Sequence, residues 1–169
     1  WNNLRKGIKP SPKNRASVAP LVKTHWDQDA PYNNMCHGGS YTGCGATAMA
    51  QVMKYWEWPR KGEGSYYYHE NDYGTLSVNF ANTMYDWDNM VDMPTTSSTL
   101  GQQNAVATLM YHCGVSIDMD YSPEGSGAIP SDVIYALKTY FDYDYNITDA
   151  YRNYYTDEQW IELLKYEIN

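Results

Sequence analysis

The segment Tyr41–Trp56, YTGCGATAMAQVMKYW, constrains the fold more than any other part of this 169-residue chain. A Thr-Gly turn leads into Cys44, and the residues that follow carry apolar side chains at the spacing of one helix face: Ala46, Met49, Ala50 and Met53. Pro59 sets a limit to that helix. The pattern therefore predicts a helix with a cysteine at its first position.

Cys44 is predicted to be a nucleophile. A thiol at a helix N-terminus lies beside N–H groups that have no intrahelical acceptor, at the positive end of the backbone dipole. This environment favours the thiolate, and the same N–H groups can stabilise an oxyanion on a carbonyl that the sulfur attacks. A small hydrophobic core residue is the commoner role for a cysteine, but glycines on both sides leave this sulfur approachable.

Composition and charge narrow the function classes. The chain has a net charge of −8, which argues against nucleic-acid binding. It has no apolar run long enough to span a membrane. Its 18 tyrosines and 6 tryptophans suit either a cleft for extended polar ligands or simply a tyrosine-rich surface. Residues 1–18 hold five basic residues and no acidic one, which indicates an arm, a linker or a removable segment.

The other elements follow from apolar spacing and turn residues. Residues 65–88 are expected to form strands, with alternation at Leu76, Val78 and Phe80 and again at Thr83, Tyr85 and Trp87. Helices are expected at Gln102–Cys113 with Gly114 as the cap, at Ser131–Phe141, and from Thr156 with Gln159 completing a capping box. The last helix is expected to bury Trp160, Leu163, Leu164 and Ile168, and a short strand is expected to carry Val115, Ile117 and Met119.

Local partners for the cysteine are scarce. Of four histidines, His112 lies about 100° around its helix from Cys113, and His25, His37 and His69 lie in loops or at a strand end, so none completes a Cys–His dyad. Cys113 is expected in the core. A zinc site built on Cys36, His37 and Cys44, with His112 and Cys113, lacks the paired spacing of structural zinc. A Cys36–Cys44 disulfide remains possible. On residue type alone, Gln28 is a surface glutamine.

Four segments, WDQDAPYN (26–33), TGCGATAMAQVMKY (42–55), YDWDNM (85–90) and GVSIDMDY (114–121), together resemble the streptopain/interpain family of secreted bacterial papain-like cysteine proteases. The similarity runs from about residue 18 to residue 169. The resemblance implies an α+β papain-like fold, represented mainly by its helical half with a few strands. Residues 19–169 would be the N-terminal part of the catalytic domain, and residues 1–18 the end of a pro-segment or an extended linker, with maturation between Lys13 and Val18.

The resemblance also assigns roles. Cys44 matches the family nucleophile, and Gln28 matches the glutamine that forms the oxyanion hole with the Cys44 N–H. Ser126, Gly127 and Ala128 match the loop that borders the substrate cleft. The implied function is a secreted, extracellular or periplasmic cysteine endopeptidase made as a zymogen. Protein or peptide substrates are the implied partners, with no cofactor, metal, nucleic acid or membrane.

Two departures from the family pattern are expected to matter. The family's catalytic histidine and most of its β-rich half lie beyond the point that matches Asn169, so this chain alone should lack the general base. Its partners would include that C-terminal part and possibly its own pro-domain, and an isolated chain should expose an apolar face. A non-enzymatic peptide-binding or partner-binding module is the alternative. Gly45 also replaces the valine of streptopain.

Overall fold

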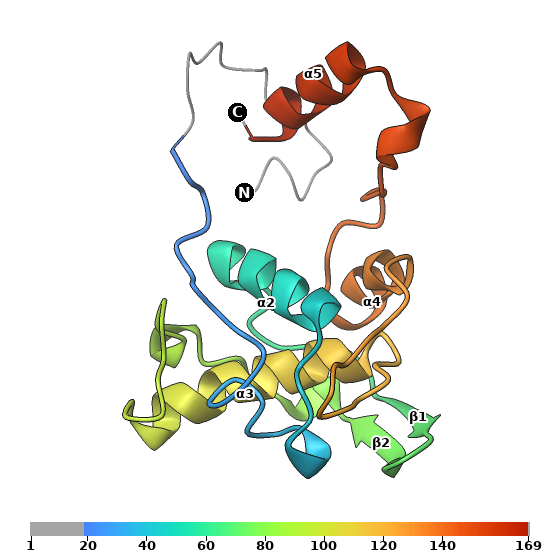
Figure 1. The fold of residues 1–169 in the computed structure, drawn as a ribbon. Coiled ribbons are helices and arrows are strands. Elements are labelled where there is room, and N and C mark those ends of the chain that lie inside the picture. The colour runs from blue at the N-terminus through green and yellow to red at the C-terminus, as the bar shows by residue number, and fades with distance from the viewer. Residues whose placement is uncertain (1–18, 169) are drawn as a thin grey trace.

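The computed structural model describes residues 19–168, so the expectations for residues 1–18 lie outside the described residues. The described part is α+β, as expected: four α-helices accompany one antiparallel hairpin (Figure 1). The helices are α2 (Cys44–Trp56), α3 (Leu100–Val115), α4 (Asp132–Tyr140) and α5 (Asp157–Ile168), and the strands are β1 (Tyr66–Glu70) and β2 (Gly74–Val78).

Helix α3 is the centre of the fold. It packs against α2 and also against both strands of the hairpin. Ten of its residues are buried, and its polar start is closed by a capping box in which Thr99 and Gln102 exchange hydrogen bonds of 3.2 and 3.3 Å. This capping box explains why α3 begins at Leu100, before the start that was predicted at Gln102. A helix buried on most sides needs such a cap, because its first N–H groups have few other acceptors.

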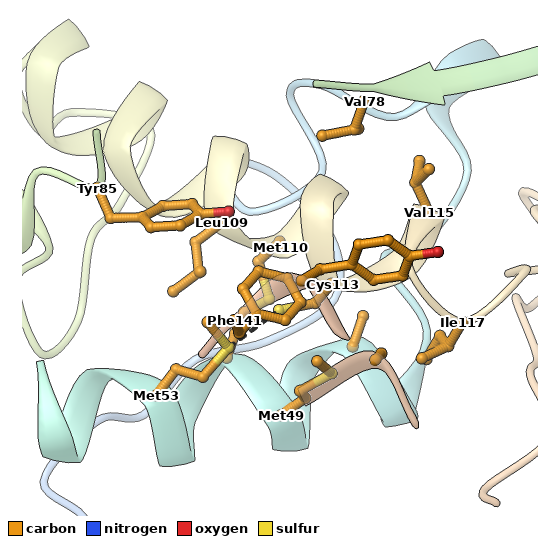
Figure 2. Close-up of a cluster of buried hydrophobic side chains, with 14 of the residues drawn as sticks. Met49, Met53, Val78, Tyr85, Leu109, Met110, Cys113, Val115, Ile117 and Phe141 are labelled. Carbon is orange, nitrogen blue, oxygen red and sulfur yellow. Dashed lines mark hydrogen bonds between the residues drawn. The ribbon is translucent and has the colours of Figure 1, made fainter. Parts of the chain in front are cut away.

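The core lies between α2 and α3. Figure 2 shows Met49 and Met53 of α2 pointing toward Leu109, Met110 and Cys113 of α3. Three methionines meet here, and their flexible side chains fill the irregular space between two helices. Cys113 is fully buried, which confirms the prediction for this residue, and burial raises the pKa of its thiol.

Gly114 has a packing role and is not the predicted helix cap. It lies inside α3, which continues to Val115. A side chain at this position would collide with the Tyr121 ring, whose Cζ lies 3.0 Å from an added Cβ. The glycine therefore lets the buried Tyr121 ring pack directly against the helix backbone.

The hairpin differs from the predicted one. The strand Gly74–Val78 pairs with the tyrosine-rich Tyr66–Glu70, with Tyr66 opposite Val78. Glu70 closes the turn, because its Oε2 accepts hydrogen bonds from the N–H groups of Asp72 and Tyr73 at 2.8 and 2.7 Å. The predicted strand over residues 83–87 is wrong.

The strand residues expected at Phe80 and Trp87 lie instead in 3₁₀ turns, Phe80–Asn82 and Trp87–Asn89. The Trp87 indole donates a hydrogen bond to the Pro59 carbonyl at 3.0 Å. The strand expected over residues 115–119 is also absent: this segment is the end of α3 followed by a turn. Burial skips one residue between Tyr85 and Trp87 and between Ile117 and Met119, but the described backbone does not join a sheet at either place.

Helix α5 lies apart from α2, α3 and α4 (Figure 1). Its predicted capping box is confirmed, with Thr156 and Gln159 exchanging hydrogen bonds of 3.0 and 3.3 Å. The prediction that it buries its apolar face is wrong, because no residue of α5 is buried and Leu164 and Ile168 are exposed. None of the described helices is both long enough and apolar enough to cross a bilayer.

Candidate functional site

Cys44 is the first residue of α2 and is exposed to solvent. The N-cap before it, Gly43, has φ 86° and ψ 143°, a conformation that glycine adopts without strain. A Cβ at Gly43 would also overlap the end of the Met119 side chain and lie 3.5 Å from Ser126 Cβ. The backbone angles therefore favour glycine immediately before the cysteine, and a side chain there would also require the end of the buried Met119 side chain to shift.

The first turn of α2 keeps its N–H donors free of a side-chain cap. Glycine offers no capping oxygen, and the first turn of a helix has no intrahelical acceptors for these groups. Thr47 is the first residue to bond back, through both its N–H and its hydroxyl to the Gly43 carbonyl at 3.0 Å. The Cys44 N–H is thus available to a ligand oxygen beside the sulfur.

Gln28 is held close to the start of α2. Its carbonyl accepts a hydrogen bond of 3.0 Å from the N–H of Thr42, two residues before the cysteine. Its own N–H donates to the Asp27 carboxylate at 2.8 Å. Within residues 19–168 the half-buried Gln28 amide group makes no hydrogen bond, so its donors are free for a substrate.

The loop at residues 122–128 is joined to the same segment. The Ser126 hydroxyl donates to the Tyr41 carbonyl at 2.7 Å, and the Tyr41 N–H donates to the Ser122 carbonyl at 3.2 Å. The Ser122 N–H in turn donates to the hydroxyl oxygen of Ser126 at 3.0 Å. Gln28 and Ser126, which are distant in sequence, therefore both contact the four residues that end at Cys44.

The backbone of this loop is hydrogen-bonded along one edge and makes no hydrogen bonds to the described residues along the other. Gly127 and Asp120 exchange two hydrogen bonds, of 2.8 and 3.0 Å. Successive residues of an extended chain direct their N–H and C=O groups to opposite sides. The backbone groups of Ser126 and Ala128 accordingly make no hydrogen bond to any described residue.

The four histidines do not form a dyad with Cys44. His112 is buried and lies 3.0 Å, through Nδ1, from the Tyr85 hydroxyl, as expected for a packed histidine. Burial lowers its pKa to about 4. The other three are exposed, and within residues 19–168 no histidine forms a hydrogen bond with the Cys44 sulfur: His25, His37 and His69.

The alternatives for the cysteines are resolved by the structure. Cys36, Cys44 and Cys113 are all free thiols, so the possible Cys36–Cys44 disulfide is not formed. Burial raises the pKa of Cys36 to about 12. The described residues contain no group of three or more His, Cys, Asp or Glu side chains arranged to hold a metal ion.

A cavity of about 310 Å³ lies beside the backbone pairing of Gly127 and Asp120. It is lined by three aspartates, three aliphatic residues and one glycine: Asp118, Asp120, Asp132, Ile117, Ala128, Ile129 and Gly127. Gly127 and Ala128 were predicted as substrate-binding residues, and the other five were not predicted as functional. The sequence held a partial signal for them. In IDMD (117–120) the acidic side chains alternate with the buried Ile117 and Met119, so they had to face away from the core.

Solved structures of similar proteins share this fold. Active wild-type interpain A cysteine protease of Prevotella intermedia is similar with a TM-score of 0.82 and 43% identity, over 95% of this chain and 69% of that one. A fragment of Prevotella intermedia prointerpain A also has a TM-score of 0.82, with 39% identity over 98% of this chain and 58% of that one.

Relatives that match this chain by sequence are also named as proteases. Thiol protease/hemagglutinin PrtT of Porphyromonas gingivalis is 29% identical over 95% of this chain. Streptopain of Streptococcus pyogenes is 29% identical over 89% of it. The chain spans 20% and 45% of the lengths of these two relatives. Because the Peptidase C10 family model matches residues 26–169, the chain belongs to the peptidase C10 family.

Proposed function

We propose that this chain carries the nucleophile of a cysteine endopeptidase. The observation that carries the proposal is the exposed Cys44 sulfur at an uncapped helix N-terminus, with the unpaired Gln28 amide anchored two residues away. Relatives named as thiol or cysteine proteases support it. An activated thiolate needs a nearby base and donors for the developing oxyanion, and this site provides the donors.

The proposed reaction begins with a thiolate–imidazolium pair. The Cys44 sulfur attacks the scissile carbonyl, and the resulting oxyanion accepts hydrogen bonds from the Cys44 N–H and the Gln28 amide. The imidazolium gives its proton to the leaving amine as the carbon–nitrogen bond breaks, which leaves an acyl-enzyme. Water, deprotonated by the same imidazole, then attacks the thioester and releases the carboxylic acid and the cysteine.

The histidine in this proposal comes from a part of the protein other than residues 1–169. Helix α2 supports this, because exposed apolar residues lie on the side opposite its core face. Beside Cys44 and Ala48 this side carries Val52, 44% exposed, and Tyr55, 41% exposed, with the half-buried Gln51 among them. Exposed apolar side chains that gather on one face mark a surface that another element covers. We propose that a second half packs on this side of α2 and brings the histidine to the sulfur.

The substrate is proposed to bind as an extended peptide along the loop at residues 126–128. The free backbone groups of Ser126 and Ala128 offer an edge to which a peptide can add as a strand. Gly127, which has no side chain, keeps that edge accessible. Because main-chain groups make these contacts, the loop would hold the peptide whatever its sequence and align the scissile bond with Cys44.

The remaining parts of the proposal concern maturation and location. A zymogen is supported by the similar structure of a pro-form, prointerpain A. Action outside the cell is supported by the relative named as a hemagglutinin, since agglutination acts on the surfaces of other cells.

The test compares full-length processed protein with its Cys44→Ala variant on casein. The expected result is loss of cleavage in Cys44→Ala, full cleavage in the control Cys36→Ser, and a kcat about 10²–10³ lower in Gln28→Ala. Casein cleavage that persists in Cys44→Ala would overturn the proposal. Absence of cleavage in every variant, with casein still bound, would favour a non-enzymatic binding module.

A further inference from the structure

Two buried threonine hydroxyls meet at the start of α2, beside the residue that carries the nucleophile. Thr42 and Thr47 are both buried, and their side-chain oxygens lie 2.9 Å apart. A threonine in a helix often donates its hydroxyl to the carbonyl four residues earlier, and Thr47 does so with Gly43. Thr42 lies before the helix, so this ordinary explanation does not account for its contact with Thr47.

The direction of each hydrogen bond follows from the number of hydroxyl protons. Thr47 has one such proton and donates it to the Gly43 carbonyl at 3.0 Å. The Thr42 hydroxyl is therefore the donor to the Thr47 oxygen, which accepts through a lone pair. The two hydroxyls form a chain that runs in one direction, from Thr42 through Thr47 to the Gly43 carbonyl. In such a chain each hydrogen bond polarises and strengthens the next, and burial keeps competing water away.

The carbonyl at the end of this chain belongs to the same peptide unit as the Cys44 N–H. A trans peptide unit is planar, and its N–H points opposite to its C=O, so whatever fixes the Gly43 carbonyl also fixes the Cys44 N–H. Gly43 itself restrains this unit little, because glycine has no side chain. The restraint comes from Thr47, whose N–H and hydroxyl both donate to the carbonyl at 3.0 Å.

Thr42 joins this peptide unit to the residue that carries the second proposed oxyanion donor. The Thr42 N–H donates to the Gln28 carbonyl at 3.0 Å, and the Thr42 hydroxyl donates to Thr47. The backbone of Gln28 and the Cys44 peptide are therefore held by two threonines that also hold each other. An oxyanion hole works only when its donors lie about 2.7–3.1 Å from the developing charge, so the relative placement of these two residues matters.

We propose that Thr42 and Thr47 are positioning residues that orient the Cys44 N–H toward the oxyanion and set its placement relative to Gln28. The inference rests on the proposed peptidase function and adds two residues to the same site. Both threonines act through the Gly43–Cys44 peptide and not by contact with the substrate. Because the oxyanion develops only on the way to the transition state, loss of the hydroxyl chain should lower kcat and leave KM nearly unchanged.

The test compares Thr47→Val with Thr47→Ser in full-length processed protein, on a fluorogenic peptide that the unaltered protein cleaves. Valine keeps the shape of the side chain and removes the hydroxyl, whereas serine keeps the hydroxyl. Thr47→Val should lower kcat roughly tenfold, less than the roughly 10²–10³-fold loss when an oxyanion donor is removed altogether. Thr47→Ser should stay within about twofold of the unaltered protein, because its hydroxyl can make the same bond.

Variants of Thr42 test whether the two hydroxyls act as one chain. Thr42→Val leaves the Thr47 bond to the Gly43 carbonyl in place, so it should lower kcat only about two- to fivefold. The double variant Thr42→Val/Thr47→Val should be no slower than Thr47→Val alone, since the second substitution removes a hydroxyl that has already lost its acceptor. Fully additive losses would contradict a single chain.

Alkylation by iodoacetamide separates this positioning role from a general structural one. In that reaction the Cys44 sulfur displaces iodide from a methylene carbon, so no oxyanion forms and the Cys44 N–H is not needed. The rate of Cys44 alkylation at neutral pH should therefore change by less than about twofold in Thr47→Val while kcat falls. If alkylation slows as much as peptide cleavage, the hydroxyls support the cysteine in general and the inference is wrong.

Thr83→Val is the matched control, because the Thr83 hydroxyl also donates to the carbonyl four residues earlier, that of Asn79, at 3.2 Å, outside α2. It should leave kcat unchanged. Equal kcat values for Thr47→Val and Thr83→Val, or a Thr47→Ser protein as slow as Thr47→Val, would overturn the inference and leave the peptidase intact. If the unaltered protein cleaves no peptide, the proposed function fails, and the inference fails with it. If urea unfolding shows that Thr47→Val does not fold, Thr42→Val decides the question by the same two measurements.

Discussion

Replacing Gly43 by alanine should destabilise the fold at the point that positions the nucleophile. The substitution places a side chain at φ 86°, which costs about 1–3 kcal/mol of backbone strain. The added Cβ also overlaps the buried Met119 side chain, and overpacking of this kind costs about 1–3 kcal/mol. The free energy of unfolding should therefore fall by roughly 2–6 kcal/mol, a large share of the roughly 5–15 kcal/mol typical of a domain.

The assay is urea unfolding of the full-length protein, with Gly39→Ala as the matched control. Gly39 also has a positive φ, 74°, but no atom lies within 4 Å of its added Cβ, so this variant measures strain alone. Met119→Ala in the Gly43→Ala background should recover the packing part, which a double-mutant cycle isolates. If Gly43→Ala costs no more than Gly39→Ala and shows no coupling to Met119, the contact does not position Cys44 as described.

Three other predictions concern buried groups. Burial lowers the pKa of His112 to about 4 from its ordinary value of 6.5, so the unfolded chain binds a proton at this histidine before the folded chain does as pH falls. About 3 kcal/mol of the free energy of unfolding that is present above pH 6.5 should therefore be lost by pH 4. H112Q should flatten this pH dependence of the urea unfolding midpoint. Gly114→Ala should cost about 1–3 kcal/mol in the same assay, and Tyr121→Phe should relieve part of it; no relief would contradict the packing. Iodoacetamide at neutral pH should label Cys44 well before Cys36, whose pKa burial raises to about 12; faster labelling of Cys36 by mass spectrometry would refute this.

Local sequence patterns predicted the helices well. The apolar faces of α2, α3 and α4 and the capping box of α5 are determined by residues within a few turns of each other, which is the range that periodicity reads. Gly114 misled the prediction because glycine has two uses. It ends helices, but it also allows close packing, and the Tyr121 contact that decides between them is not visible in local sequence.

The failed strands have a common cause. Alternating burial at Tyr85 and Trp87, and at Ile117 and Met119, comes from segments that cross the core without sheet partners. Periodicity reports which side chains are buried and does not report how the backbone is hydrogen-bonded. In α5 it identified the apolar stripe, but nothing in the pattern specifies which surface covers it.

The candidate site was predictable only in part. The glycines around Cys44 indicated an approachable thiol, and the structure leaves that thiol exposed. The contacts of Gln28 with Thr42 and of Ser126 with Tyr41 join distant segments, so only the family resemblance could bring these residues into the prediction. Neither local sequence nor the family resemblance predicted the three aspartates of the cavity, because their grouping depends on how the segment at residues 117–132 folds back on itself.

A covalent trap would show whether Cys44 is the nucleophile. Full-length processed protein is incubated with a peptide that ends in a thiol-reactive fluoromethyl ketone, and the modified residue is identified by mass spectrometry. We expect stoichiometric modification of Cys44, an exposed free thiol, and none at the buried Cys113. Modification at Cys36, or no modification while an unrelated cysteine protease reacts under the same conditions, would contradict the assignment of Cys44 as the nucleophile.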